Sequence, residues 1–346
     1  MQNLNLKGKY MQEKALQNKR VSFEEAKEVF DKPFMDLLAL AHSVHEKHFD
    51  SNAIQTSTLL SVKTGNCPED CSYCAQSSKY KTSVEAHDLL ELDMILDYAR
   101  AAKEKGTQRF CMGASGRKPS DKDLDTLCEA ITKIKEMGLQ TCATLGLLSK
   151  EQASRLKESG LDFYNHNVDT SREFYPKVIS TRTLEDRLET IEAAREAGLR
   201  LCVGGILGLG ESNDDRLRML VLLANLPTPP ESIPINRLVK IPGTPLANSC
   251  GGVDSKAKDS VDCFDFVRVI AVARILLPSS YIRLSAGRSA MSEALQALCF
   301  FAGANSVFYG DKLLTTPNSD TNEDDALFQR LNLTKEAQMN LNNSVI

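Results

Sequence analysis

The sequence has 346 residues, of which 42% are hydrophobic and 25% charged, and its formal net charge is -4 at pH 7. These values are those of an ordinary globular protein and give no reason to expect a nucleic-acid or membrane-surface partner. No run approaches the roughly 20 apolar residues that span a bilayer, and the N-terminus lacks the apolar core of a secretory signal. We therefore predict an intracellular, cytoplasmic protein, while the basic residues near the N-terminus leave a mitochondrial location open.

The chain also contains ten cysteines. Reducing compartments disfavour structural disulfides, so this number indicates metal or redox chemistry.

Helical periodicity begins near the N-terminus. Ser22 and Glu25 form a capping-box pattern, and apolar residues then recur at helical spacing to about Val44. This pattern predicts a helical extension over residues 1–56, followed by a main domain over residues 57–317. The chain after Pro317 is polar, and we assign residues 318–346 to a C-terminal helix or tail that packs on or trails from that domain.

Short β-type runs alternate with amphipathic helical stretches in the main domain. Glycines stand where helix C-caps belong, and Ser149 with Gln152 makes a second capping box. Parallel strands need crossover connections, so eight such units predict a (β/α)8 TIM-type barrel of the α/β class. An open doubly wound sheet is the alternative. The strands are expected at Thr58–Lys63, Arg109–Gly113, Thr141–Leu145, Phe163–Val168, Leu201–Ile206, Ile233–Val239, Tyr281–Ser285 and Ser306–Tyr309, and an exposed loop at Asn248–Ser260.

Three cysteines converge directly after the first strand, where Cys67, Cys71 and Cys74 fall within eight residues. Fe–S clusters take thiolate ligands, and three local thiolates leave one corner of a cubane open for a substrate or cofactor. The position also suits catalysis, because barrel active sites lie at the carboxyl ends of the strands. A structural zinc site is the alternative, although it normally takes four protein ligands and no second cysteine pair follows at zinc-finger spacing.

The Cys-x3-Cys-x2-Cys spacing resembles the cluster motif of the radical S-adenosylmethionine (SAM) superfamily. The resemblance implies a 4Fe-4S cluster held by Cys67, Cys71 and Cys74, with SAM on the open iron and Tyr73 close to it. Reductive cleavage of SAM then yields a 5'-deoxyadenosyl radical. Gly204, Gly205 and Ile206 open a segment after the fifth strand that is similar to the superfamily's adenine-contacting segment. An ordinary flexible loop is the alternative for that segment, whose glycine spacing does not match a Rossmann fingerprint.

Three further cysteines, Cys111, Cys142 and Cys202, fall on the second, third and fifth predicted strands. Side chains alternate along a barrel strand, and a buried free cysteine is common as a small apolar residue. Three inward thiols could instead hold a 2Fe-2S cluster deep in the barrel.

Four longer segments narrow the resemblance to the biotin synthase family, over about Phe23 to Pro317. They are Thr64–Cys71, Tyr164–Asp169, Leu226–Ser232 and Tyr281–Arg288. The resemblance implies that Cys111, Cys142, Cys202 and Arg283 bind a 2Fe-2S cluster whose sulfide is inserted into dethiobiotin, giving biotin in the last step of its biosynthesis. Only the resemblance makes Arg283 a ligand. A protonated guanidinium has no lone pair, and chemistry alone favours an ion pair with a carboxylate.

Asn165, Asn167 and Asp169 alternate along the end of the fourth predicted strand, which places them on one face. Their amides and carboxylate suit hydrogen bonds to a ribose and to a ureido ring. The resemblance implies such roles towards SAM and dethiobiotin and adds Asn236. A polar layer without a ligand is the alternative. We assign Arg187 a contact with SAM, with a solvent-facing helix arginine as the alternative.

The resemblance also implies a homodimer, a flavodoxin- or ferredoxin-type electron donor and service by the Fe–S assembly machinery. Other radical SAM enzymes, of cofactor maturation or methylornithine formation, remain alternatives, as does an Fe–S carrier without substrate chemistry. We assign no role to the remaining histidines and cysteines. Exposure is expected for His42, His45 and His48, and ordinary packing or exposure for Cys128, Cys250, Cys263 and Cys299.

Overall fold

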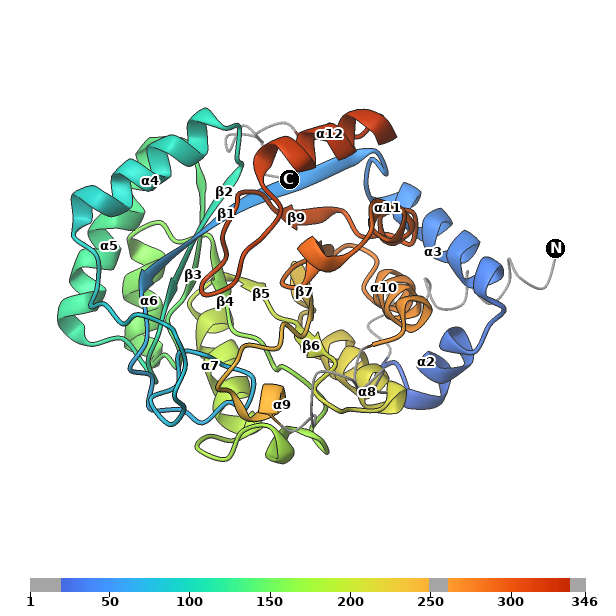
Figure 1. Ribbon diagram of the computed structural model, residues 1–346, viewed down its shortest axis with the longest axis horizontal. Coiled ribbons are helices and arrows are strands. Elements are labelled where there is room, and N and C mark those ends of the chain that lie inside the picture. The colour runs from blue at the N-terminus through green and yellow to red at the C-terminus, as the bar shows by residue number, and fades with distance from the viewer. Residues whose placement is uncertain (1–19, 249–260, 337–346) are drawn as a thin grey trace.

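The computed structural model describes residues 20–248 and 261–336, and this part of the chain contains a closed barrel of parallel strands (Figure 1). The barrel strands pair in the order β1-β2-β3-β4-β5-β7-β8-β9, and β9 pairs with β1 to close the ring. The (β/α)8 prediction is therefore confirmed. The strands are β1 (Ala53–Lys63), β2 (Arg109–Ala114), β3 (Gln140–Thr144), β4 (Phe163–Asn165), β5 (Arg200–Cys202), β6 (Gly205–Leu207), β7 (Ser232–Arg237), β8 (Tyr281–Leu284) and β9 (Ser306–Phe308).

The fifth barrel strand is divided into two short pieces, β5 and β6. β5 pairs with β4 and β7, whereas β6 pairs with β7 and its Gly205 forms an isolated bridge with Asp169. The glycine between them is needed for close approach, because a Cβ on Gly204 would lie 1.9 Å from the carbonyl oxygen of Pro234. β4 also ends at Asn165 rather than at Val168, since the following segment turns through a left-handed backbone conformation at Asp169, with φ of 65°.

Helices surround the strands, and the capping signals predicted for them are confirmed. The capping box of Ser149 and Gln152 is present, and the glycines expected at helix ends have positive φ values. The covering elements are α4 (Leu92–Glu104), α5 (Asp121–Glu136), α6 (Lys150–Glu158), α7 (Leu184–Glu196), α8 (Asn213–Ala224), α10 (Cys263–Leu276) and α11 (Glu293–Phe301), with the short α9 (Pro245–Asn248), η1 (Tyr175–Lys177) and η2 (Arg288–Ala290) in the loops. Of the loop expected at Asn248–Ser260, residues 249–260 lie outside the described residues.

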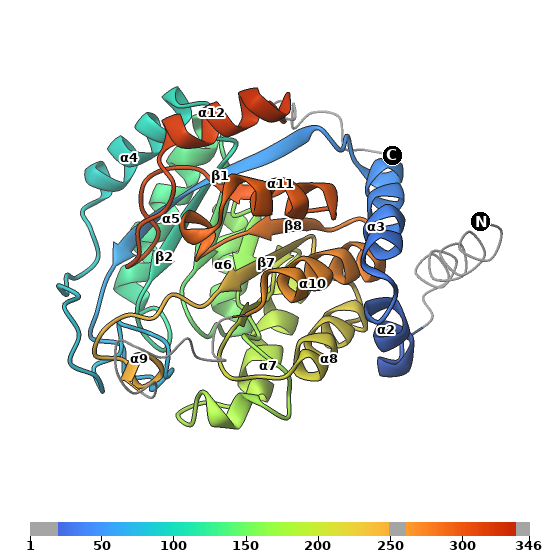
Figure 2. The same ribbon diagram turned by 45° about the vertical axis from the view of Figure 1, so that its right-hand side comes forward.

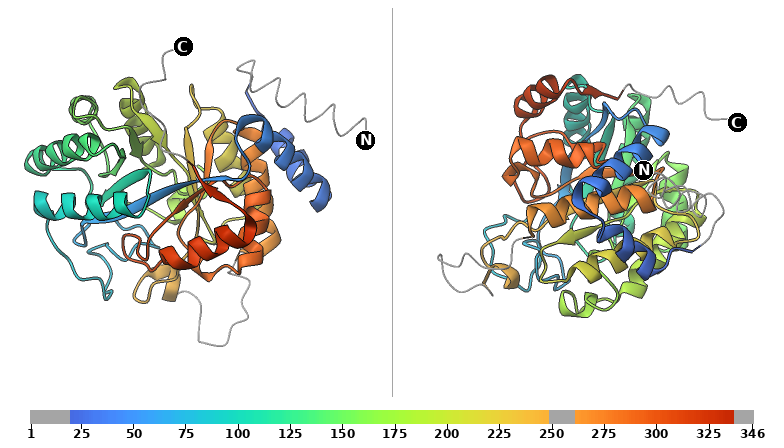
Figure 3. Two further views of the ribbon diagram at one scale, coloured as in Figure 1. Left: turned by 90° about the horizontal axis from the view of Figure 1, so that it is seen from above. Right: turned by 90° about the vertical axis from the view of Figure 1, so that its right-hand side faces the viewer.

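The N-terminal extension forms two helices, α2 (Phe23–Phe30) and α3 (Phe34–His48). They are separate because Pro33 has no backbone N–H and stands at the N-cap of α3. Figures 2 and 3 show both helices outside the barrel's own helices, alongside α8 and α10. The expectation of three exposed histidines is wrong for His45, which is fully buried because its face of α3 packs on α10.

The C-terminal residues pack more closely than a polar tail requires. α12 (Thr321–Leu331) buries Leu327 and Phe328, and β10 (Thr334–Lys335) pairs in parallel with the start of β1. β10 was not expected from the sequence. The division of the chain at residue 317 stays a prediction. Among the described residues, no helix has both the length and the apolar character that a membrane span requires.

Candidate iron–sulfur and SAM site

A cavity of about 310 Å³ opens at the carboxyl ends of the barrel strands, and both cysteine sets contribute to its lining. Cys67, Cys71 and Cys74 line it from the loop after β1, and Cys111 and Cys142 line it from β2 and β3. The size is that of a small-molecule site, for which about 300 Å³ is the lower end of the usual range. Residues from eight strands, β1 to β4 and β6 to β9, and from the loops that follow them therefore meet around one space.

Of the three cysteines in the loop, Cys71 is buried and Cys67 and Cys74 are half-buried. Burial raises the pKa of the Cys71 thiol, and burial together with Cys71 raises the pKa of Cys74 to about 12. A bound cation reverses this effect, because coordination removes the thiol proton. Among the described residues, no three His, Cys, Asp or Glu side chains converge tightly enough for a single metal ion. A cluster spreads its ligands over several irons, so its ligands need not converge on one point.

The second cysteine set lies deeper in the barrel. Cys111 and Cys142 face each other across β2 and β3, and both pack with Cys202 in one buried group. The neighbouring Cys142 thiol and the charge of Arg283 lower the pKa of Cys202. All three thiols are at least 96% buried and form one group with Phe163. The three therefore point inward together, as a shared ligand set requires.

Arg283 lies beside these thiols on β8. Its Nη1 is 3.9 Å from the Cys202 sulfur, and its other donors reach the neutral oxygens of Ser306 (3.0 Å), Ser57 (3.1 Å) and Gln55 (3.3 Å). In the described chain no carboxylate pairs with it, so the ion pair favoured by chemistry alone is not found. Arg283 thus keeps its positive charge directed at sulfur.

A second buried arginine accompanies the set, and sequence reasoning missed it. Arg109 stacks its guanidinium 3.6 Å from the ring centroid of Phe163 and donates Nε and Nη2 to Gln140. Its buried Nη1 has no partner among the described residues. The sequence shows only a charged residue at the start of a strand, and burial could not be inferred from that position.

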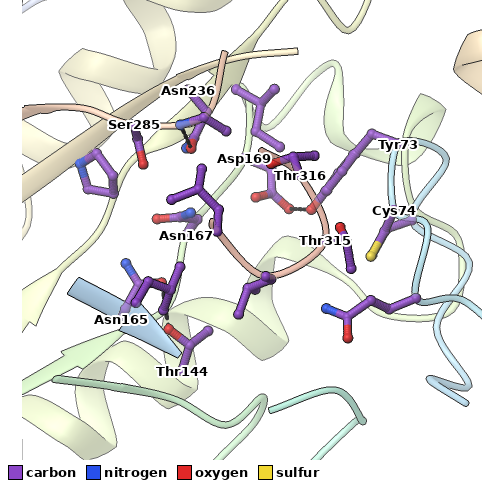
Figure 4. A pocket seen from close by; sticks show the side chains of 18 of the residues that line it. Tyr73, Cys74, Thr144, Asn165, Asn167, Asp169, Asn236, Ser285, Thr315 and Thr316 are labelled. Atoms are coloured by element: carbon purple, nitrogen blue, oxygen red, sulfur yellow. Dashed lines mark hydrogen bonds between the residues drawn. The ribbon is translucent and has the colours of Figure 1, made fainter. Parts of the chain in front are cut away.

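Asp169 joins Tyr73 of the cysteine loop to Arg187 of α7 in the lining of the cavity. It is buried, and its Oδ2 accepts hydrogen bonds from the Tyr73 hydroxyl (2.8 Å) and from Arg187 Nη2. Arg187 also donates to the Asn167 carbonyl oxygen (2.6 Å) and to the Tyr175 hydroxyl (2.7 Å). The solvent-facing alternative for Arg187 is therefore wrong. Figure 4 shows Tyr73 and Asp169 joined across the cavity.

The three predicted asparagines line the same cavity, although β4 ends before Asn167. Asn165 accepts from Thr144 Oγ1 (3.1 Å), and Asn167 Oδ1 accepts from the Gly204 N–H (3.1 Å). Asn236 bridges the Gly205 carbonyl and the Ala286 N–H. No protein acceptor for the Asn167 Nδ2 lies in the described residues, which leaves this donor for a ligand.

The glycine-rich segment is built into the barrel rather than free. Ile206 lines the cavity, and its N–H donates to the Asp169 carbonyl oxygen at 2.8 Å. A Cβ on Gly205 would lie 2.6 Å from that same oxygen, so the glycine permits the contact. Glu211 accepts from the Gly208 N–H and pairs with Arg216. The flexible-loop alternative is not supported by these contacts.

Sequence reasoning also missed the loop between β9 and α12. Leu313, Leu314, Thr315 and Thr316 line the cavity, and Figure 4 shows the two threonines among the polar residues around it. The loop is tied back by Asn318, whose amide donates to the carbonyls of Phe308 and Gly310. Two adjacent threonines are not a recognisable binding motif in a single sequence. The fold places them in the lining of the cavity.

Comparison with known proteins agrees with this geometry. A model of the Radical SAM superfamily matches residues 61–224, and one of the Biotin and Thiamin Synthesis associated domain matches residues 234–334. The chain is 56% identical to biotin synthase of Cronobacter sakazakii over 91% of its own length and 88% of the relative's. It is also 56% identical to biotin synthase of Neorickettsia sennetsu, over 91% and 94% of the two lengths.

Two solved structures share the fold. Methylornithine synthase aligns with a TM-score of 0.75 at 19% identity, over 95% of this chain and 98% of the other. The FeFe-hydrogenase maturase HydG from Carboxydothermus hydrogenoformans aligns with a TM-score of 0.72 at 21% identity, over 95% and 79%. At these identities the likeness concerns the barrel alone.

The barrel, its cysteine loop and the superfamily match define a radical SAM enzyme, which uses a 4Fe-4S cluster and SAM. Within that class the chain belongs to the biotin synthase family, as the 56% identity over most of both chains shows. It is accordingly a sulfur-inserting enzyme of biotin biosynthesis, with the 2Fe-2S cluster that is characteristic of this family. The carrier alternative and the other radical SAM activities are set aside by this membership.

Proposed function

We propose that Cys67, Cys71 and Cys74 hold the 4Fe-4S cluster, that Cys111, Cys142, Cys202 and Arg283 hold the 2Fe-2S cluster, and that SAM and dethiobiotin bind in the cavity between them. The observation that carries the proposal is the lining of one cavity by thiols of both sets. When bound, the first cluster and SAM supply a 5'-deoxyadenosyl radical for hydrogen abstraction, and the second cluster supplies sulfide.

The protein's own part is to hold the reactants at short range and exclude water. Asp169 is fixed by Tyr73 and Arg187, so its carboxylate is oriented before a ribose binds. The free Nδ2 of Asn167 can donate to a ribose or ureido oxygen, while Asn165 and Asn236 add polar atoms to the same wall. Gly204, Gly205 and Ile206 support an adenine-binding edge beside Asp169.

The loop after β9 also contributes to the cavity lining. Leu313 and Leu314 supply apolar cover, and the hydroxyls of Thr315 and Thr316 can bind a polar end of the substrate. Dethiobiotin has both an aliphatic part and polar ends, so this mixed lining suits it. Electrons are proposed to come from a flavodoxin- or ferredoxin-type donor, clusters from the Fe–S assembly machinery, and the working form is proposed to be a homodimer. These partners rest on family membership.

The test is anaerobic reconstitution with iron and sulfide, reduction in the presence of SAM and dethiobiotin, and mass-spectrometric detection of 5'-deoxyadenosine and biotin. Both products are expected. Deoxyadenosine without biotin, when both clusters are verified by spectroscopy, would contradict dethiobiotin as the substrate. The absence of both products from a fully loaded enzyme would contradict the radical SAM assignment.

Single cysteine variants separate the two ligand sets. Cys71→Ala is expected to abolish both products, because it removes a ligand of the cluster that cleaves SAM. Cys111→Ala is expected to abolish biotin while SAM binding persists. Cys128, half-buried on α5, provides the matched control, and Cys128→Ala should leave both products unchanged. Biotin formation by Cys111→Ala would remove Cys111 from the sulfur-donor site.

A further inference from the structure

The acidic residues inside the cysteine loop are bound by a distant segment of the chain. Asp70 accepts hydrogen bonds from the backbone N–H groups of Ser180 (2.9 Å) and Thr181 (3.1 Å). The Thr181 hydroxyl donates to Glu69 and Asp70, and Arg117 Nη1 bridges the Glu69 carboxylate and the Thr181 carbonyl oxygen, both at 2.9 Å. The segment of residues 180–181 is therefore clamped onto the loop between Cys67 and Cys71.

The clamp fixes the next residue, Arg182, against the cysteine loop. Arg182 Nη2 donates to the Cys71 sulfur at 3.6 Å, and its side chain lines the cavity. The nearby carboxylates are engaged elsewhere, Glu69 with Arg117 and Asp169 with Arg187. The buried Nε of Arg182 has no partner among the described residues. The guanidinium charge is thus left to act on sulfur rather than on a carboxylate.

We propose that Arg182 is a positioning residue of the 4Fe-4S site, which donates an N–H to the Cys71 thiolate and raises the reduction potential of the cluster. The inference rests on the proposed assignment of Cys67, Cys71 and Cys74 as ligands. Reduction adds negative charge to a cluster, and hydrogen bonds to its sulfurs are one of the protein's means of setting its potential. A fixed cation at Cys71 stabilises the reduced form that SAM cleavage requires.

The experiment is a redox titration of the reconstituted enzyme, followed by the electron paramagnetic resonance signal of the reduced 4Fe-4S cluster. Arg182→Gln is expected to lower the ratio of reduced to oxidised cluster about tenfold at a fixed potential, which is about 59 mV for one electron. Arg172→Gln is the matched control. Arg172 lies in the same loop region but is exposed and paired with Glu185, so the potential should stay at the wild-type value.

Two further variants test whether the charge and the fixed position of Arg182 set the potential. Arg182→Lys retains the charge and should recover part of the potential, because a lysine ammonium lacks the fixed guanidinium fork. Thr181→Val removes the hydroxyl bonds to Glu69 and Asp70 and should shift the potential in the same direction as Arg182→Gln, by less. The potential reports only on loaded protein, so incomplete loading does not mask the result.

The outcomes distinguish this inference from the proposed function. If wild-type enzyme shows no change of its cluster signal on addition of SAM, the proposed ligand assignment fails. If wild-type enzyme shows that change and Arg182→Gln has the wild-type potential, the inference about Arg182 fails and the assignment stands.

Discussion

Asp169 shows how one side chain can organise a binding site. Its left-handed backbone, with φ of 65°, interrupts the strand direction and turns the carboxylate towards Tyr73 and Arg187. Asparagine and aspartate are the residues that tolerate this conformation best after glycine. Burial by itself lowers the pKa of Arg187, but the charge of Asp169 outweighs burial and raises this pKa. The two side chains form a buried ion pair.

We predict that Asp169→Asn weakens SAM binding by at least about tenfold, or roughly 1.4 kcal/mol. The amide keeps the backbone conformation but leaves Arg187 as an unpaired buried charge, so the free energy of unfolding should also fall by about 3 kcal/mol. SAM titration of reconstituted enzyme and urea unfolding check the two effects. Asp97→Asn is the control, because Asp97 is 72% exposed and its pair with Arg100 contributes little. Wild-type SAM affinity in Asp169→Asn would contradict the ribose role.

The residues of the site differ in how far the sequence could predict them. The spacing of Cys67, Cys71 and Cys74 is local, so a single segment carries the signal. Arg283 followed only from resemblance, since protonated arginine is no ordinary ligand. Arg182 and Arg109 were missed because their importance lies in partners that are far away in the sequence, the Cys71 sulfur for the first and the Gln140 amide with the Phe163 ring for the second.

At the scale of elements, local sequence rules predicted which strands exist better than where each strand begins and ends. All eight barrel strands were predicted, and five of them, β2, β3, β4, β5 and β9, follow a helix that ends at a glycine with positive φ. The division of β5 from β6 was not, since it depends on the approach of Gly204 to Pro234 across two strands. β1 begins at Ala53 rather than Thr58, because β9 and β10 supply partners for its first residues.

The attachment of α12 also depends on contacts that the sequence does not show. Arg288 and Asp324 form an ion pair that is completely enclosed, with side chains 0% and 1% exposed. Arg288 donates in addition to Gln296 and to the Phe308 carbonyl oxygen. Phe308 precedes the loop of residues 310–318 and Asp324 follows it, so the contacts of Arg288 fix both ends of this cavity-lining segment. Figure 1 shows α12 beside α11 at this edge of the barrel.

We predict that Arg288→Met lowers the free energy of unfolding by about 3–5 kcal/mol, because Asp324 becomes an unpaired buried charge. The double variant Arg288→Met with Asp324→Leu should recover much of that loss. Urea unfolding measures both, and limited proteolysis should cut first near α12 in the single variant. The exposed pair Arg330–Glu293 joins α12 to α11, and Arg330→Met should cost less than about 1 kcal/mol. Equal effects of Arg288→Met and Arg330→Met would contradict the enclosed pair's role.

The whole molecule places its two thiol sets at different depths of one barrel. Cys67, Cys71 and Cys74 lie beyond the end of β1, whereas Cys111 and Cys142 lie within β2 and β3. A substrate in the cavity therefore has one set towards the mouth and the other towards the barrel interior. Closed sheet hydrogen bonding surrounds this space, which suits chemistry that must exclude water.

The N-terminal helices make the stability of the whole molecule depend on pH. His45 on α3 is fully buried, and neither ring nitrogen has a partner among the described residues. Burial, with smaller contributions from Arg274 and His42, lowers its pKa from 6.5 to about 3. The unfolded chain therefore binds a proton between these pH values that the folded protein does not. Stability is full above pH 6.5 and is lost as the pH falls towards 3.

We predict that His45 lowers the free energy of unfolding by about 1.4 kcal/mol for each unit that the pH falls below 6.5. This value is the free energy that corresponds to one unit of pKa difference. His45→Leu keeps an apolar side chain of suitable size at the contact with α10 and should remove this dependence on pH. The free energy of unfolding of the variant should therefore exceed that of the wild type by more as the pH falls. Urea unfolding at several values between pH 5 and 8, with equal cluster content, measures the difference. The exposed His87 supplies the control, and His87→Gln should follow the wild-type profile. A constant difference between His45→Leu and wild type across this range would show that His45 does not set the acid sensitivity.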